Sequence, residues 1–465
     1  MSKMFKMVER FYLQVYGCQM NQYDAGVVRN ILTNVGYEET KKEEEADLIF
    51  LITCAVREHA ERRALGRLQG LCALKKKNSH KLIGVLGCMA QRMKESLIND
   101  YRVDLVIGPD EYRRLPELIR QSRMEKAPKM ATNIGQECYS DLQPLPESQV
   151  SAFVTIMRGC SNFCSYCIVP YIRGPERSRP VESIITEVKQ LAKSGVKEVT
   201  LLGQNVLAYK SLDEMGMAVD FADLLTRVAE MPEIERVRFL TSHPRDLNER
   251  VVESIKDLPK VCHEFHLPLQ SGSNRILQLM NRGYTQEEYL KKVAMVREKI
   301  PDACLTTDII VGFPTETKED FAETLRIVKS VRFDFAYMYR FSLRLGTKAT
   351  ALKPQVPAEE AKERLERLIE VQNQITKEEN EKMVGRVYEV MVEKEKPCLG
   401  RTRQGKMVVV EESLPLGSIV PVRIISIRGW TPIGKVSPES GEYRPSAVSR
   451  LKEGEKERRL IYGNF

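Results

Sequence analysis

The chain has 465 residues, 42% hydrophobic and 29% charged, which indicates a folded protein of two to four domains at roughly 100–200 residues each. The net charge of +8 is mild, but residues 383–465 hold 15 Lys and Arg against 10 Asp and Glu, which favours a polyanionic partner at that end. No apolar run approaches the ~18–20 residues that cross a membrane, and no signal peptide is evident. We therefore expect a cytoplasmic protein with no membrane partner, whose eleven cysteines serve metal binding or catalysis rather than disulfides.

The N-terminal part alternates apolar runs with amphipathic stretches. Strands are predicted at 11–16, 47–53, 81–87 and 104–107, with helices between them, for example at 24–35 and 56–74. Strand alternating with helix is typical of a parallel sheet, so we expect an α/β domain over residues 10–125. Residues 126–145 lose this period and are predicted to be a linker.

The alternation returns over residues 146–380, the expected core domain. Its predicted strands are 153–157, 198–202, 236–241, 263–267, 305–311 and 335–341. Six β/α units predict a partial (β/α)6 barrel, because a closed barrel needs eight.

The C-terminal part changes character after a charged amphipathic helix predicted at 358–382. Short strands follow, separated by Gly and Pro, at 385–392, 405–410, 418–427 and 432–436. This pattern is typical of a small all-β barrel, which we place at residues 383–446, followed by a polar tail at 447–465.

The first group of chemical residues follows the first barrel strand directly. Cys160, Cys164 and Cys167 lie at i, i+4 and i+7 in one loop. Three thiolates on a cluster of four irons leave one iron open to a small molecule. A structural zinc would need a fourth ligand, and the next histidine is distant, at His243. The loop therefore predicts a [4Fe-4S] cluster, with zinc or an unrelated thiol group as the alternative.

The second group is dispersed, at Cys18, Cys54 and Cys88. Each cysteine comes just after a predicted strand, and the spacings of 36 and 34 residues each span about one βαβ unit. Neighbouring parallel strands end at the same sheet edge, where α/β sheets bind ligands. We therefore predict a second cluster with an open iron at this edge, although buried structural cysteines remain the alternative.

Polar or Gly-rich segments follow the remaining barrel strands, on the face where β/α barrels gather their active sites. They are residues 203–205, 242–244, 268–273, 312–314 and 342–344. Any one of them reads as an ordinary turn, but together with the cysteine loop they predict a cofactor rim.

The spacing of Cys160, Cys164 and Cys167 resembles that of the radical S-adenosylmethionine (SAM) superfamily, in which the open iron binds SAM and an electron cleaves it to a 5′-deoxyadenosyl radical. The resemblance implies that Tyr166, the aromatic before the last cysteine, lies near the adenine of SAM. Further SAM contacts are expected from Gln204, Ser242, Gln270, Asp308 and Arg344.

Nearly the whole chain resembles the MiaB-type radical SAM methylthiotransferases. The motifs that carry this resemblance are residues 16–21, 167–179, 241–244, 266–273 and 308–314. Two departures are local: Thr315 stands where the family has Gly, and Leu345 stands where it has Pro. The C-terminal barrel resembles the RNA-binding TRAM domain, and we expect its removal to weaken tRNA binding while sparing the radical site.

The resemblance implies transfer of a methylthio group to C2 of N6-isopentenyladenosine at position 37 of tRNA. It implies two [4Fe-4S] clusters and two SAM molecules per turnover, one as methyl donor and one as radical source. The expected partners are the tRNA anticodon stem-loop, an electron donor of flavodoxin or ferredoxin type and a sulfur donor, with the enzyme a monomer.

Three alternatives stay open from the sequence. A RimO-like enzyme would modify an Asp of a ribosomal protein, although its motif usually reads Leu-Gly-Cys-Pro-Lys-Asn where this chain has Tyr-Gly-Cys-Gln-Met-Asn at 16–21. A third branch of the family acts on threonylcarbamoyladenosine in tRNA. The non-enzymatic alternative is an RNA-binding protein that keeps its clusters for structure.

Overall fold

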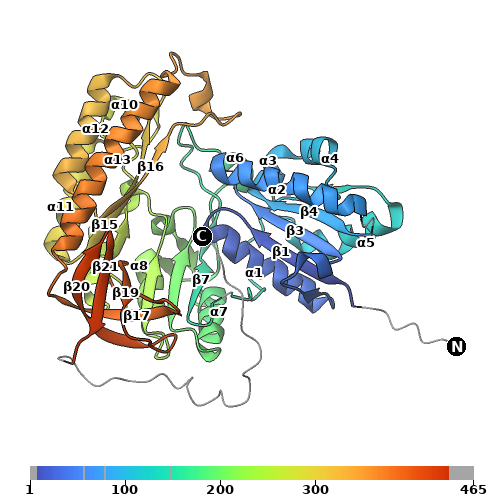
Figure 1. Ribbon diagram of the computed structural model, residues 1–465, viewed down its shortest axis with the longest axis horizontal. Coiled ribbons are helices and arrows are strands. Elements are labelled where there is room, and N and C mark those ends of the chain that lie inside the picture. The colour runs from blue at the N-terminus through green and yellow to red at the C-terminus, as the bar shows by residue number, and fades with distance from the viewer. Residues whose placement is uncertain (1–7, 56–57, 78–79, 147, 439–465) are drawn as a thin grey trace.

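The computed structural model describes residues 8–438 apart from residues 56–57, 78–79 and 147. Three units follow one another along the chain: an N-terminal α/β unit, a central barrel and a small C-terminal barrel (Figure 1). The predicted tail at 447–465 and the last residues of the predicted C-terminal barrel, 439–446, lie outside the described residues. Within the described part of the chain, no helix combines the length and the apolarity needed to span a membrane.

A six-stranded parallel sheet forms the N-terminal unit, in the order β2-β1-β3-β4-β5-β6. Its strands are β1 (Arg10–Val15), β2 (Glu38–Glu39), β3 (Leu48–Thr53), β4 (Leu82–Gly87), β5 (Leu105–Ile107) and β6 (Lys129–Ala131). One face packs against α1 (Gln19–Asn34) and α5 (Leu115–Glu125), and the other against α2 (Glu58–Lys77), α3 (Cys88–Met93) and α4 (Glu95–Tyr101). Because both faces are covered, every residue of β3 and β4 is buried.

The four predicted strands of this unit are confirmed, but two edge strands were not predicted. Strand β2 consists of two exposed glutamates, and β6 begins with a half-buried lysine, so neither carries an apolar run. The segment predicted to be a linker from residue 126 therefore contributes the last strand of the sheet.

The central unit confirms all six predicted strands as a partial barrel. They are β7 (Ser151–Thr155), β10 (Glu198–Leu202), β13 (Arg236–Phe239), β14 (Glu264–His266), β15 (Cys304–Val311) and β16 (Phe335–Arg340). Strands β7-β10-β13 form one parallel sheet and β14-β15-β16 another. A bridge between Val237 and Val261 joins the two sheets.

Helices and short antiparallel strand pairs complete the central unit. The helices are α6 (Val169–Arg173), α7 (Val181–Lys193), α8 (Phe221–Ala229), α9 (Glu249–Asp257), α10 (Asn274–Leu279), α11 (Gln286–Lys299), α12 (Lys318–Val331) and α13 (Ala358–Glu381). Strand β8 (Met157–Arg158) pairs antiparallel with β9 (Arg177–Ser178) on the far side of α6, and β11 (Lys210–Leu212) forms a hairpin with β12 (Ala218–Asp220). Helices α8, α11 and α12 begin in capping boxes, which satisfy backbone donors that a helix start leaves unpaired.

Five strands close the C-terminal barrel in the order β17-β18-β19-β21-β20. They are β17 (Val387–Glu395), β18 (Cys398–Thr402), β19 (Met407–Val410), β20 (Ile419–Arg428) and β21 (Thr431–Val436). Strand β18 was not predicted, because its inward residues are Cys398, Gly400 and Thr402 rather than large apolar ones.

This small barrel closes the lower end of the central barrel (Figure 1). Arg236 of β13 is fully buried and donates to the carbonyl of Arg401 at 2.7 Å and to the carboxylate of Glu389 at 2.9 Å. Arg238, on the same strand, donates to the carbonyl of Thr402 at 2.7 Å. The two barrels therefore share a buried polar interface.

Candidate active site

The first cysteine group occupies the loop between β8 and α6. Gly159 opens the loop with φ +78°, and a Cβ there would lie 1.9 Å from the carbonyl oxygen of Pro175, so only glycine fits. The N–H of Cys160 donates to the Gly174 carbonyl at 3.1 Å, and that of Cys167 donates to the Cys164 carbonyl at 2.9 Å. These bonds fold the three cysteines into one compact loop.

Burial dominates the electrostatics of this loop. It raises the pKa of Cys160, and it raises the pKa of Cys167 to about 12. The guanidinium of Arg282, itself buried, lies 3.4 Å from the Cys164 sulfur and 3.4 Å from the Tyr166 hydroxyl. A buried cation beside the thiols favours their charged form, and metal binding, which requires thiolates, would release the protons that burial retains.

Three polar side chains follow the carboxyl ends of neighbouring barrel strands. Gln204 Oε1 follows β10, Ser242 Oγ follows β13 and Gln270 Oε1 follows β14, and all three atoms are buried without a hydrogen-bond partner among the described residues. Buried polar atoms are nearly always paired in folded proteins. Their arrangement therefore fits a polar ligand held at this rim, as the sequence predicts for SAM.

Two more of the residues predicted to contact SAM, Arg344 and Asp308, have side-chain partners within the chain. Arg344 donates to Glu61 of the N-terminal unit at 3.0 Å, and both side chains are almost buried. Asp308 accepts from His266 at 3.3 Å on the inner face of the barrel. The charge of Arg344 is thus compensated within the chain, and Asp308 lies in a second polar group.

The second cysteine group lies where the sequence predicts, at the carboxyl ends of adjacent strands β1, β3 and β4. Gly17 precedes Cys18 with φ +123°, and a Cβ there would lie 2.4 Å from the Cβ of Cys54. A hydrogen bond with Cys54, helped by the charge of Arg173, outweighs burial and lowers the pKa of Cys18 to about 6. Burial raises the pKa of Cys88, whose sulfur accepts a hydrogen bond from Arg173 Nε at 3.2 Å.

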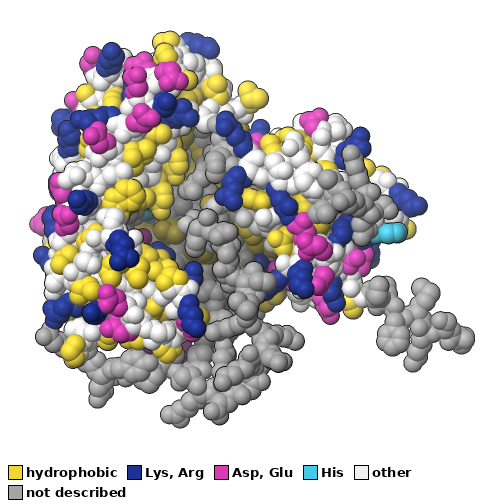
Figure 2. All heavy atoms as spheres, viewed as in Figure 1, with side chains coloured by type: hydrophobic (Ala, Val, Ile, Leu, Met, Phe, Trp, Pro, Cys, Tyr) yellow, Lys and Arg dark blue, Asp and Glu magenta, His cyan; other side chains and the backbone are white. Residues whose placement is uncertain are grey.

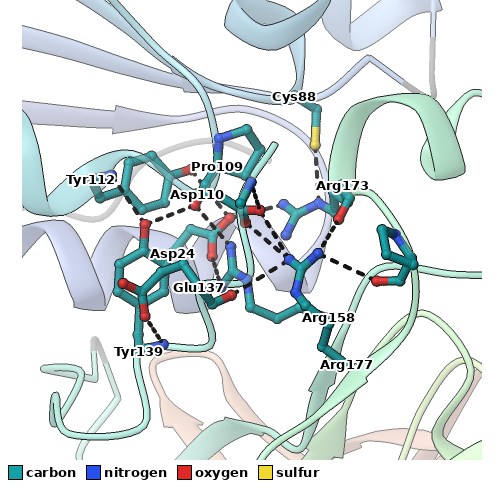
Figure 3. A network of polar contacts seen from close by, with 12 residues as sticks. Asp24, Cys88, Pro109, Asp110, Tyr112, Glu137, Tyr139, Arg158, Arg173 and Arg177 are labelled. Carbon is teal, nitrogen blue, oxygen red and sulfur yellow. Dashed lines mark hydrogen bonds and ion pairs between the residues drawn. The ribbon is translucent and has the colours of Figure 1, made fainter. Parts of the chain in front are cut away.

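A buried charge network connects Cys88 of the second group to the segments on either side of the first cysteine loop (Figure 3). Asp24 of α1 has no exposed surface and accepts from Arg158 and from Arg173, each at 2.8 Å. Arg173 ends α6, the helix that follows the first cysteine loop, and also contacts Cys88. Arg177 of β9 adds an ion pair with Asp110 at 3.1 Å. The network therefore fixes the loop of the central barrel against the cysteine edge of the N-terminal sheet.

The cysteines of both groups are free thiols in this structure. In the described residues, no three His, Cys, Asp or Glu side chains converge closely enough to hold one metal. A zinc ion draws its sulfur ligands to about 2.3 Å, whereas the ligands of a four-iron cluster bind different irons. Two groups of three free thiols, each with an arginine beside one of its sulfurs, are compatible with clusters of this kind.

Three residues of this site were not singled out from the sequence. Arg173 stands inside a motif that carries the resemblance, but its motif gives no sign of its contact with Cys88. Asp24 lies on the amphipathic helix α1, where a charged residue usually faces water, so its sequence position does not indicate burial. Arg282 follows α10 in a turn and has no pattern that would mark it.

Models of three known families match the chain. The Radical SAM superfamily matches residues 154–328, the Uncharacterized protein family UPF0004 matches residues 10–108, and the TRAM domain matches residues 381–436. Each match falls on one of the three structural units.

Curated relatives match along nearly their full length. A protein of Bacteroides fragilis named tRNA-2-methylthio-N(6)-dimethylallyladenosine synthase is 46% identical over 90% of this chain and 93% of its own. The protein of that name from Alkaliphilus oremlandii is 45% identical over 93% of each chain, and that from Acetivibrio thermocellus is 44% identical over 92% and 90%.

Among solved structures, the radical S-adenosylmethionine methyltransferase TsrM of Kitasatospora setae superposes with a TM-score of 0.55 at 13% identity. It covers 74% of this chain and 77% of its own. At this identity the likeness concerns the fold alone.

Proposed function

Because the chain belongs to the family of tRNA-2-methylthio-N6-dimethylallyladenosine synthases, we propose that it transfers a methylthio group to C2 of N6-isopentenyladenosine at position 37 of tRNA. The chain is a radical SAM enzyme of the transferase class. The hydrogen on C2 of adenine is not acidic and is not a leaving group, so acid–base chemistry does not readily replace it. Radical chemistry is suited to that position.

One observation carries the proposal: the helix that follows the first cysteine loop ends in Arg173, which is buried and donates to Cys88 of the second cysteine group and to Asp24. We assign Cys160, Cys164 and Cys167 to the cluster that binds SAM, and Cys18, Cys54 and Cys88 to the auxiliary cluster. When bound, the first cluster supplies the radical from SAM and the second supplies the sulfur. Gln204, Ser242 and Gln270 would orient SAM through atoms that otherwise lack partners, with Tyr166 beside its adenine.

The surrounding residues hold this arrangement in place. Arg282 and Arg173 each donate to a cysteine sulfur, and both side chains are buried. Hydrogen bonds to ligating sulfurs adjust the potential of iron–sulfur clusters. Asp24 fixes Arg173 in turn, so a charge pair shielded from water holds the helix after the first cysteine loop against the N-terminal unit.

The partner is a tRNA, and its contacts fall to the C-terminal barrel in this proposal. The TRAM match covers that barrel, and its described surface includes the exposed cations Arg386, Lys394, Lys396 and Arg428. We further propose a cytoplasmic monomer that takes electrons from a flavodoxin- or ferredoxin-type protein and sulfur from a separate donor.

The test counts iron after anaerobic reconstitution. The wild-type enzyme should hold about eight irons, and alanine at Cys160, Cys164 and Cys167 should remove about half and abolish SAM cleavage. Alanine at Cys18, Cys54 and Cys88 should also remove about half, ending thiolation while some SAM cleavage persists. The matched control replaces Cys72, Cys138 and Cys398 and should keep all of the iron. Full iron content in either motif variant would contradict the assignment.

The substrate is tested separately by supplying three acceptors in parallel: prenylated tRNA, threonylcarbamoyl tRNA and the ribosomal-protein peptide. Mass spectrometry should find methylthio product from the prenylated tRNA. Preferential turnover of either other acceptor would overturn the substrate while leaving the radical chemistry in place. SAM consumption to 5′-deoxyadenosine under reducing conditions separates all three from a purely structural cluster protein.

A further inference from the structure

The inner face of β14, β15 and β16 carries a second group of side chains below the rim. In the parallel register, Thr306 of β15 pairs with His266 of β14 and with Phe335 of β16. Asp308 pairs with Tyr337 two positions along. Paired residues of neighbouring strands point to the same side, so these five side chains share one face.

The opposite face of these strands identifies the first as the interior of the barrel. Leu305, Ile309 and Ala336 are buried in the core that includes residues of α11 and α12. The helices cover that outer face, so the five side chains point away from them, into the barrel.

Two aromatic rings lie next to each other on this inner face. Phe335 and Tyr337 are 45% and 44% exposed, and their ring centroids lie 5.0 Å apart in an edge-to-face arrangement. The ring of His266 packs against Tyr337 at 6.0 Å. Figure 2 shows hydrophobic side chains gathered along the flank of the central barrel and over the small barrel beneath it. Neighbouring exposed aromatics inside a barrel mark a binding surface for an apolar or aromatic group.

Polar groups of defined orientation lie beside the rings. The His266 ring is held at both nitrogens, by the Thr306 hydroxyl at 3.0 Å and by the Asp308 carboxylate at 3.3 Å. A carboxylate has acceptor sites for several hydrogen bonds, and the Asp308 side chain is 28% exposed. The surface therefore combines an aromatic wall with a fixed hydrogen-bond acceptor.

This surface adjoins the rim assigned to SAM. The N–H of Gln270 donates to the Asp308 carbonyl at 2.8 Å, and the N–H of Ile310 donates to the Gln270 carbonyl at 2.9 Å. Gln270, which carries one of the three unpartnered rim atoms, is thus bonded to the strand on both sides of Ile309. A group bound at Asp308 and Tyr337 would lie directly below the rim.

We propose that Tyr337, Phe335 and Asp308 form the pocket for the target base and its N6 substituent. The inference rests on the proposed function, since it takes N6-isopentenyladenosine as the occupant. The adenine ring stacks on Tyr337, and Asp308 accepts the one N–H that an alkylated N6 retains. Phe335, nearer the floor of the barrel, packs against the isopentenyl group.

The chemistry of the base agrees with this orientation. C2 and the N6 substituent project from different sides of N1, so an adenine held by N6 at depth directs its C2–H toward the rim. A base that enters a barrel must leave its stack, and aromatic side chains replace the stacking it loses. The prenyl group has no hydrogen-bonding capacity, so an apolar ring is the partner that distinguishes it from hydrogen.

Binding of anticodon stem-loop RNAs with and without the isopentenyl group tests the pocket, using reconstituted enzyme and fluorescence titration. Phe335→Ala should bring the ratio of the affinities for prenylated and unmodified RNA close to one, with little change in the affinity for the unmodified RNA. Tyr337→Leu should lower the affinity for both RNAs about tenfold. Tyr337→Phe should retain the affinity, because it keeps the stacking ring. Leu212→Ala, on an exposed hairpin, is the matched control and should change neither affinity.

The outcomes separate the pocket from the function. If the wild-type enzyme thiolates and prefers prenylated RNA, yet Phe335→Ala keeps that preference or weakens both RNAs equally, the pocket assignment is overturned alone. If the wild-type enzyme neither prefers nor thiolates prenylated RNA, the proposed function itself fails. Iron content equal to wild type confirms that each variant folds with its clusters.

Discussion

At the scale of single residues, Asp24 has the most demanding position in the protein. It is fully buried and forms ion pairs with two buried arginines that belong to another domain. Burial would raise the pKa of Asp24, but Arg158 and Arg173 outweigh burial and hold that pKa below its ordinary value. The carboxylate therefore stays charged, and both guanidiniums depend on it.

We expect Asp24→Asn to destabilise the protein by about 3–5 kcal/mol at neutral pH, because two buried cations lose their counter-ion. A carboxyl group whose pKa is depressed by folding stabilises the fold above its unfolded-state pKa, and this contribution is lost as the pH falls through the folded-state pKa. The loss in free energy of unfolding caused by the substitution should thus be complete at pH 7 and become smaller below about pH 4. Urea unfolding across this range measures it, with the exposed Asp257→Asn as control. An equal deficit at pH 3 and pH 7 would contradict the argument.

At the scale of elements, each cysteine group depends on the loop that introduces it. Gly17 and Gly159 each stand directly before the first cysteine of a group, with positive φ and with no room for a Cβ. In both loops the obstacle is close: the Cβ of Cys54 in one and a backbone carbonyl in the other. The two loops can therefore be disturbed one at a time.

Gly17→Ala should remove about half of the iron by displacing Cys54, and Gly159→Ala should remove the other half by opening the loop of Cys160. Gly195→Ala is the matched control, because Gly195 has φ +97° but nothing within 4 Å of the added Cβ. Iron analysis with electron paramagnetic resonance distinguishes the two losses. If Gly195→Ala lost as much iron as the others, backbone strain rather than crowding would be the cause.

At the scale of the whole molecule, the C-terminal barrel is both an RNA-binding candidate and the floor of the central barrel. Arg236 is fully buried, and the acceptors described for it, Arg401 and Glu389, both belong to the small barrel. The sequence alone treats this barrel as separable. Its contacts indicate that removing it also exposes the lower end of the radical SAM barrel to water.

We expect deletion of residues 383–465 to lower the unfolding temperature of the remaining chain as well as its affinity for tRNA. Alanine at Lys394, Lys396 and Arg428 should weaken tRNA binding with no change in unfolding temperature, because these side chains are exposed. The slope of log affinity against log salt should become shallower, by up to about 0.9 for each phosphate that the variant no longer neutralises. Calorimetry and binding titrations at several salt concentrations separate the two effects. Unchanged stability of the deleted protein would contradict the role as a floor.

The sequence predicted the elements and cysteines that follow simple periodicity. Cys18, Cys54 and Cys88 could be grouped because each ends an apolar strand, and parallel strands end together. It could not place Asp24, because a charge on an amphipathic helix usually faces water and only the docked central barrel supplies its arginines. Strand β18 was missed for a similar reason, since small inward residues suit a narrow barrel but show no apolar period.

The fate of Arg344 shows the same limit. Its place after the last barrel strand predicts a cofactor contact, which stays a prediction, but nothing in that segment indicates its ion pair with Glu61 of the N-terminal unit. Partners that come from a different domain are invisible to a pattern read along one segment.

The charge pairs around Asp24 also constrain how this protein can change over generations. Replacing Asp24 alone leaves two buried arginines without their counter-ion, and replacing either arginine alone changes the charge balance around a buried carboxylate. Each single substitution therefore lowers stability. We therefore expect these three residues either to be substituted together or to stay unchanged. A chimera that takes its N-terminal unit from a distant relative should fold well only when the incoming helix brings an acidic residue at the position of Asp24.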